Sequence, residues 1–124
     1  MSITMTEEIS RARWPDFFNA FSLGHENWLV TVEIFAPEIG AQVEANSLRF
    51  EGINADLKAG QDRIMISLGE AFDANITHMI SAPTHVRIER SELERGTFET
   101  LQIETEGGAT TLIRFLAGVD PDTV

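Results

Sequence analysis

Two of the three histidines, His78 and His85, carry the most chemically useful spacing in this sequence, because imidazole is the side chain that titrates near neutral pH. They lie on two short extended runs joined by Ser81-Ala82-Pro83. If that junction is a tight corner, the runs pair side by side, so that His78 faces Arg87 and Ile80 faces His85. His78, His85 and Arg87 are therefore the candidate binding residues of the sequence.

Two imidazoles on neighbouring strands could hold a metal ion, and Glu89 falls on the same face. A zinc site needs a third or fourth ligand, and no nearby residue is spaced as an obvious donor. We therefore expect an ordinary exposed strand face, with no metal and no cofactor. The alternative that stays open is a pocket near His78, His85 and Arg87 that takes a small ligand or a metal.

Two carboxylates offer the chemistry of general acid–base catalysis. Pairing Ala36 with Ala41 across the turn at 37–40 sets Glu33 opposite Glu44. Facing carboxylates can share a proton and raise one pKa, although two exposed glutamates would equally splay into water. The sequence assigns no catalytic residue.

The remaining charged side chains have simpler interpretations. Arg87, Arg90 and Arg114 would bind an anion if they converged, but cross-strand pairing with the many glutamates is the expected arrangement. His25 follows a predicted helix and is interpreted as a cation near its negative pole.

Several classes of site and partner are excluded or disfavoured by composition and motifs. There is no G-x-S-x-G sequence, no glycine-rich phosphate loop and no cysteine. Nine Lys and Arg residues against twenty Asp and Glu residues give a net charge of −11, and the basic residues are scattered. Such a chain gains nothing from counterion release on a phosphate backbone and is repelled by anionic lipid. Nucleic acid and membrane surfaces are therefore not expected as partners.

The element that must position these residues is the strand at 28–36, in which large apolar side chains occur on both faces. Upstream, Trp14, Phe17, Phe18 and Phe21 recur with helical spacing, so a short helix is predicted with one aromatic face docked on the sheet. We expect this helix to end at a left-handed Gly24.

Residues typical of turns and bulges divide the rest of the chain into further predicted strands. Gly52 is expected to form a bulge or bend. A three-residue loop at 106–108 keeps Leu101 and Ile113 on one face and offers Gly108 for the left-handed position. The spacing predicts a mainly β fold with about six or seven strands, closing into a curved antiparallel barrel with the helix at one end.

With 124 residues, of which 43% are hydrophobic, the chain is the size of one domain. We expect a loosely ordered start at 1–13, a single β-barrel-like domain at 14–116 and a flexible acidic tail at 117–124. The first residues lack the pattern of a signal peptide, and no apolar run reaches membrane-spanning length, so a cytoplasmic location is expected.

A set of motifs extends over nearly all of residues 14–115. They are Trp14-Pro15 with Phe17-Phe18 and Phe21-Ser22, Trp28-Leu29-Val30-Thr31-Val32-Glu33, Gly40-Ala41-Gln42-Val43-Glu44-Ala45, Glu51-Gly52-Ile53-Asn54-Ala55-Asp56-Leu57, Asp62-Arg63-Ile64, Leu68-Gly69, Pro83-Thr84 with Val86-Arg87, and Thr111-Leu112-Ile113-Arg114-Phe115. Together these motifs resemble a family of small uncharacterised bacterial proteins known as a domain of unknown function. The resemblance implies a compact domain and carries over no activity, cofactor or functional residue.

The function predicted from the sequence is that of a non-enzymatic interaction module that contacts another protein or its own copy through unpaired strand edges. The alternative is a small-ligand or metal-binding domain, or a minor enzyme, with a pocket near His78, His85 and Arg87.

Overall fold

The computed structural model describes residues 3–69, 75–93 and 96–116. In these residues eight strands and one α-helix follow one another along the chain. They are β1 (Ile3–Ile9), the short 3₁₀ segment η1 (Arg11–Arg13), α1 (Trp14–Gly24), β2 (Leu29–Ala36), β3 (Gly40–Asp56), β4 (Arg63–Gly69), β5 (Asn75–Ser81), β6 (Pro83–Leu93), β7 (Gly96–Thr105) and β8 (Thr110–Leu116). None of the helical segments in the described ranges is long and apolar enough to cross a membrane.

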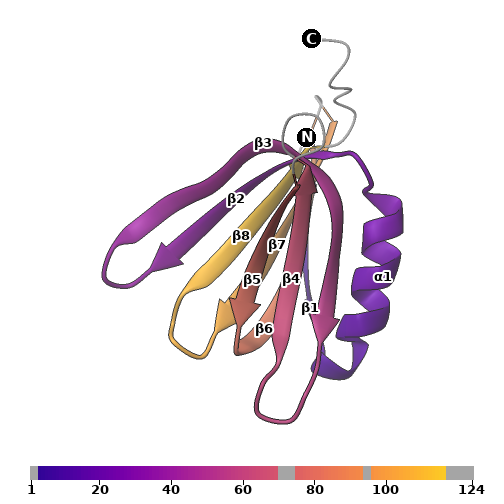
Figure 1. The fold of residues 1–124 in the computed structure, drawn as a ribbon. Helices are drawn as coiled ribbons and strands as arrows, with labels where there is room; N and C mark the ends of the chain where they lie inside the picture. Colours follow the sequence, from indigo (N-terminus) through magenta and orange to yellow (C-terminus); the bar gives the residue numbers. More distant parts are fainter. Residues whose placement is uncertain (1–2, 70–74, 94–95, 117–124) are drawn as a thin grey trace.

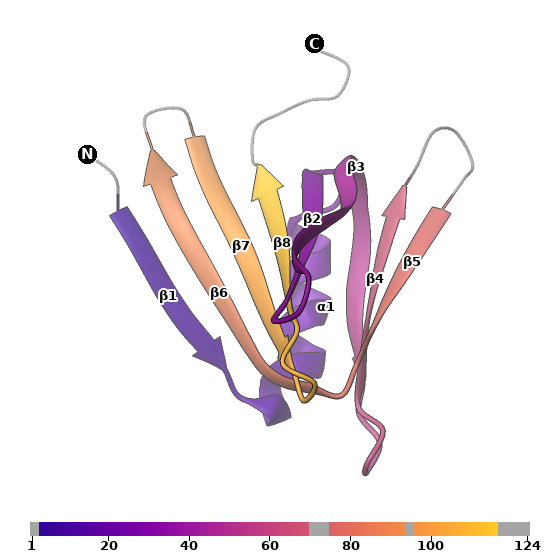
Figure 2. The same ribbon diagram turned by 90° about the vertical axis from the view of Figure 1, so that its left-hand side faces the viewer.

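The strands form one antiparallel sheet in the order β1-β6-β7-β8-β2-β3-β4-β5, and β3 folds it into two layers. The first part of β3 pairs with β2 up to Arg49, and the part from Arg49 onward pairs with β4. Figures 1 and 2 show β3 bending from one layer, which contains β1, β6, β7, β8 and β2, into the other, which contains β4 and β5. The mainly β prediction is confirmed.

The predicted barrel of six or seven strands is wrong. Among the described residues β1 pairs only with β6 and β5 pairs only with β4, so the two edge strands do not close the sheet. The layers spread apart at one end and approach each other at the other end (Figure 2). A long bent strand lets the two layers cover each other's apolar faces, so burial is achieved without closure.

Ala82 joins the layers at their narrow end. Its backbone has a positive φ of 51°, and the chain passes through it directly from β5 into β6. Its N–H donates to the Asp62 carbonyl at 3.1 Å, and its carbonyl accepts from the Glu106 N–H at 2.9 Å. The junction is therefore a crossing between layers and not the tight corner that the sequence suggested.

The core lies between the layers and is built from the inward side of nearly every strand. Its members alternate along the strands with exposed residues, as a sheet with one buried face requires. They include Ile9, Val30, Val32, Phe50, Ile53, Ile64, Ile66, Leu68, Ile80, Val86, Ile88, Leu101, Ile103, Ile113 and Phe115.

The helix α1 closes one side of this core, on the side away from the β2–β3 turn (Figure 1). The predicted aromatic face is confirmed, since Trp14, Phe18 and Phe21 are buried and Phe17 packs against the core. Pro15 stands in the first turn, where its missing N–H costs no hydrogen bond. The predicted left-handed Gly24 is wrong, because α1 includes Gly24 and the positive φ of 70° occurs at Asn27.

The start of the chain differs from the expectation of loose order, because β1 pairs with β6 over Ile3–Ile9. Among residues 4–9 of β1, whose burial is described, Ile9 alone is buried, and Glu7 interrupts the apolar alternation by which sequence reasoning identifies strands. The predicted tail at 117–124 and the loop expected at 70–74 lie outside the described residues.

Two turn predictions are confirmed. Leu101 pairs with Ile113 and Thr105 bonds to Ala109, which leaves the loop at 106–108, and Gly108 has φ 90°. The register of β3 and β4 shifts between Phe50 and Gly52, as expected for a bulge.

Candidate functional site

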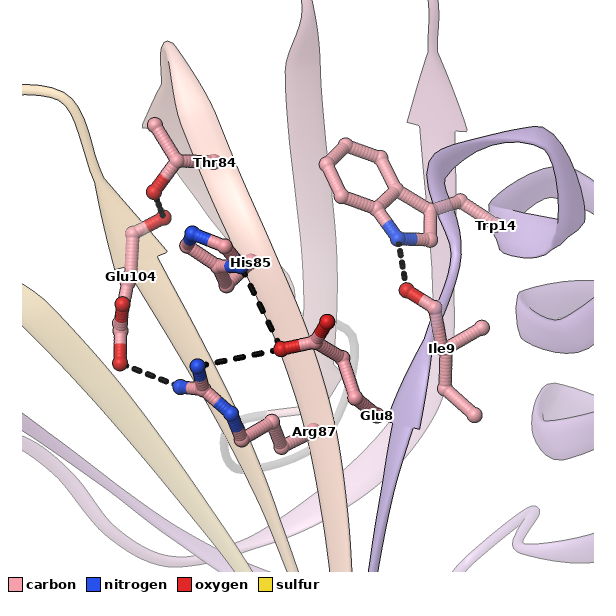
Figure 3. A network of polar contacts seen from close by, with 7 residues as sticks. All are labelled: Glu8, Ile9, Trp14, Thr84, His85, Arg87 and Glu104. Carbon is pink, nitrogen blue, oxygen red and sulfur yellow. Dashed lines mark hydrogen bonds and ion pairs between the residues drawn. The ribbon is translucent and has the colours of Figure 1, made fainter.

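The predicted site residues His85 and Arg87 lie together on the outer face of β1, β6 and β7 (Figure 3). Glu8 bridges them, with its Oε1 atom 3.3 Å from His85 Nδ1 and 3.1 Å from Arg87 Nη2. Arg87 Nη1 also pairs with Glu104 on β7. The side chains of Glu8 and His85 are about half exposed, so water and salt screen this network.

The third predicted member, His78, does not join this network. β5 and β6 are not neighbours, and His78 pairs with Ile66 of β4 on the side of β5 that faces the core. The predicted pairing of His78 with Arg87 is therefore wrong, because Ala82 carries the chain from one layer to the other instead of folding β6 back on β5.

The predicted carboxylate pair is also wrong. Glu33 stands opposite Val43, because Ala36 pairs with Gly40 and not with Ala41. Val32 stands opposite Ala45, so Glu44 is the extra residue of a bulge between the pairs Val32–Ala45 and Glu33–Val43.

The three arginines of the predicted anion site pair instead with glutamates on neighbouring strands. Arg87 contacts Glu104, Arg90 Nε lies 3.2 Å from Glu99 Oε1, and Arg114 Nε lies 3.4 Å from Glu33 Oε1. This is the cross-strand pairing that the sequence favoured. In the described parts of the chain, no group of three His, Cys, Asp or Glu side chains could hold a metal ion.

A further cluster, which sequence reasoning did not connect, joins the end of α1 to β6 and β7. His25 Nε2 is hydrogen-bonded to Glu99 Oε2, and Glu99 also accepts from Arg90. The His25 ring stacks on Phe21 with centroids 3.7 Å apart and lies 4.3 Å from the Trp28 ring. The signal in the sequence was a carboxylate at an inward position, because Glu99 alternates with the buried Leu101 and Ile103.

The hydrogen-bond partners of His25 indicate which of its ring nitrogens carries a proton. Its Nδ1 lies 2.8 Å from the Phe21 carbonyl, which can only accept, so Nδ1 carries a proton. The Glu99 bond then needs a second proton. Burial raises the pKa of Glu99, but the hydrogen bond and charge of His25 and the charge of Arg90 outweigh burial and leave this pKa below its usual value.

The comparison with protein families matches residues 5–123 of the chain to a family of unknown function (DUF5335). The chain belongs to this family. The match confirms the resemblance to a domain of unknown function. No curated protein and no solved structure matches the chain. The function of this DUF5335 chain therefore has to be argued from its own residues.

The two outer strands of the DUF5335 sheet differ in charge. β1 carries Glu7 and Glu8, and Glu8 already binds His85 and Arg87. β5 has the sequence Asn-Ile-Thr-His-Met-Ile-Ser, with no proline and no acidic or basic residue other than His78. Because edge strands are usually protected by such charges or by proline, β5 is the less protected edge.

Proposed function

We propose that this chain is a non-enzymatic interaction module that associates with a second copy of itself through strand β5. The proposal depends on one observation above all: β5 is an edge strand without a charged residue or proline to block pairing. Within the described residues, β5 has β4 on one side and no strand on the other over positions 76–81. The backbone groups on that side are available to another strand.

The outward face next to this edge supports the same interface. Met65 pairs with Met79 and Ser67 pairs with Thr77, and all four alternate with inward residues of the core. Met79 is 54% exposed. A second chain that pairs with β5 would cover this methionine and extend an uncharged surface.

Charge favours β5 over the opposite edge. Each copy carries a net charge of −11, so two copies approach at least cost where acidic side chains are absent. At β1, Glu7 and Glu8 would face the same residues of the other copy in an antiparallel pair. At β5, two antiparallel strands related by a two-fold axis make an isologous contact that closes at a dimer.

Substitution of Met79 by lysine tests the proposal, with Met5→Lys as the matched control. Both methionines are exposed and lie on edge strands, Met79 on β5 and Met5 on β1. We expect wild-type protein and Met5→Lys to be dimers in native mass spectrometry and sedimentation velocity. Met79→Lys is expected to be monomeric, because the two-fold axis brings the new charges close together.

Two outcomes would contradict this proposal. If the wild-type chain stays monomeric at a concentration of about 100 μM, self-association through β5 is too weak to support the proposed function. A dimer that Met5→Lys dissociates and Met79→Lys preserves would assign the interface to β1.

A further inference from the structure

A cavity of about 320 Å³ is lined by residues from both layers of the sheet. One wall comes from β5, and the other comes from β2 and from β7 and β8 near their connecting loop. The cavity holds the volume of about ten water molecules in the liquid. It lies at the lower end of the range of cavities that bind small molecules.

The described residues of the lining are mainly apolar and include no carboxylate. Val32 and Ile80 are buried in it, and Ile34 extends the apolar surface toward the opening. Thr111 is also buried and contributes a small polar residue. Among the described residues of the lining, His78 is the only titratable one.

His78 gives the cavity a specific polar group. Its Nε2 atom is buried and has no hydrogen-bond partner within the described ranges of the chain. Buried polar atoms in proteins are almost always hydrogen-bonded, so an unpaired atom of a residue that lines a cavity points to a partner that enters the cavity. His78 occupies an inward position next to the buried Ile80, so the strand itself directs the ring between the layers.

We propose that this cavity binds a small neutral molecule with an apolar body and one hydroxyl group, an alcohol or a phenol, and that His78 Nε2 bonds the hydroxyl. A hydroxyl can donate or accept a hydrogen bond, so it satisfies Nε2 in either tautomer of the ring. The apolar body replaces water against Val32, Ile34 and Ile80. A neutral ligand is favoured over an anion, because the net charge of −11 repels anions.

The test uses 2-naphthol as the probe, in an amide chemical-shift titration of the full chain. We expect saturable shifts at Val32, Ile80 and Thr111, which lie on both walls. His78→Phe keeps a ring and removes the nitrogen, so it should weaken binding about fivefold, the effect of one neutral hydrogen bond. His85→Phe, on the outer face, is the matched control and should leave the dissociation constant unchanged.

A second substitution and a second probe complete the experiment. Ile34→Trp, which fills the cavity from the opposite wall, should remove binding, and 2-naphthoate should bind less tightly than 2-naphthol. The proposal is overturned if 2-naphthol gives no saturable chemical shift change up to about 1 mM. It is also overturned if His78→Phe and Ile34→Trp both bind 2-naphthol as tightly as the wild type. Tighter binding of 2-naphthoate would overturn the assignment of a neutral ligand. The oligomer mass of His78→Phe is measured in parallel, so failure of the cavity proposal is distinguishable from failure of β5 pairing.

Discussion

His25 illustrates how a single side chain can connect distant parts of this molecule. It stands just after α1, yet its ring bonds the Phe21 carbonyl at one nitrogen and Glu99 of β7 at the other. The sequence predicted only its position near the negative end of a helix, and that interpretation agrees with the bond to Phe21. The partner Glu99 lies 74 residues away, so no local pattern could have identified it.

The carboxylate of Glu99 gives a prediction about acid stability. Its pKa is lower in the folded chain than the ordinary value of 4.5, so ionised Glu99 stabilises the fold above pH 4.5, and this contribution is lost as pH falls through the lower, folded value. We expect Glu99→Gln to reduce the free energy of unfolding by about 1–3 kcal/mol at pH 6. The difference from wild type should shrink progressively below pH 4.5.

Urea denaturation of both proteins between pH 6 and pH 3 measures this difference. Glu104→Gln serves as a control, because Glu104 binds Arg87 on the outer face, where its side chain is 39% exposed. A Glu99→Gln effect that grows toward acid pH would contradict the assigned direction.

Among the elements, β3 has the largest influence on the fold. Its length of 17 residues lets it belong to both layers, and its bulges bend it between them. The bulge at Gly52 was predictable, because a glycine interrupts an apolar alternation. The bulge at Glu44 was not predictable, because no glycine or proline marks it.

The part of β3 that pairs with β4 is hydrogen-bonded to α1 through the hydroxyl group of Ser22. Ser22 Oγ donates to the Ile53 carbonyl at 3.0 Å and accepts from the Ile53 N–H at 2.9 Å, in place of a neighbouring strand. We expect Ser22→Ala to lower the free energy of unfolding by about 1–3 kcal/mol, because it leaves both backbone groups without this partner.

Leu23→Ala is the control for this experiment. Leu23 is the next residue of α1 and is 81% exposed, so its truncation should change the free energy of unfolding by less than about 0.5 kcal/mol. Guanidinium denaturation compares the three proteins. Equal stability of Ser22→Ala and wild type would show that α1 is held by its aromatic face alone.

For the whole molecule, the excess of acidic residues opposes the proposed dimer through electrostatic repulsion. Two copies that each carry a charge of −11 repel, and salt weakens this repulsion. The Debye length falls from about 30 Å at 0.01 M salt to about 3 Å at 1 M salt. Because β5 contributes no ion pair to the proposed contact, we expect the dimer fraction to rise as sodium chloride is added.

Sedimentation velocity at these two salt concentrations measures the dimer fraction. A dimer that dissociates as salt rises would instead depend on ion pairs, and would direct attention to the outer surface of Glu8, His85, Arg87 and Glu104.

By itself, the sequence determined several local features of this protein: the aromatic face of α1, the strand β2 of the β2–β3 hairpin, the bulge at Gly52 and the loop that ends at Gly108. These features depend on side-chain period and on backbone angles, which neighbouring residues specify. Only the tertiary structure decided which strands are neighbours. It separated His78 from His85, placed Glu99 beside His25 and left the sheet open, because pairing between distant strands depends on how the whole core is buried.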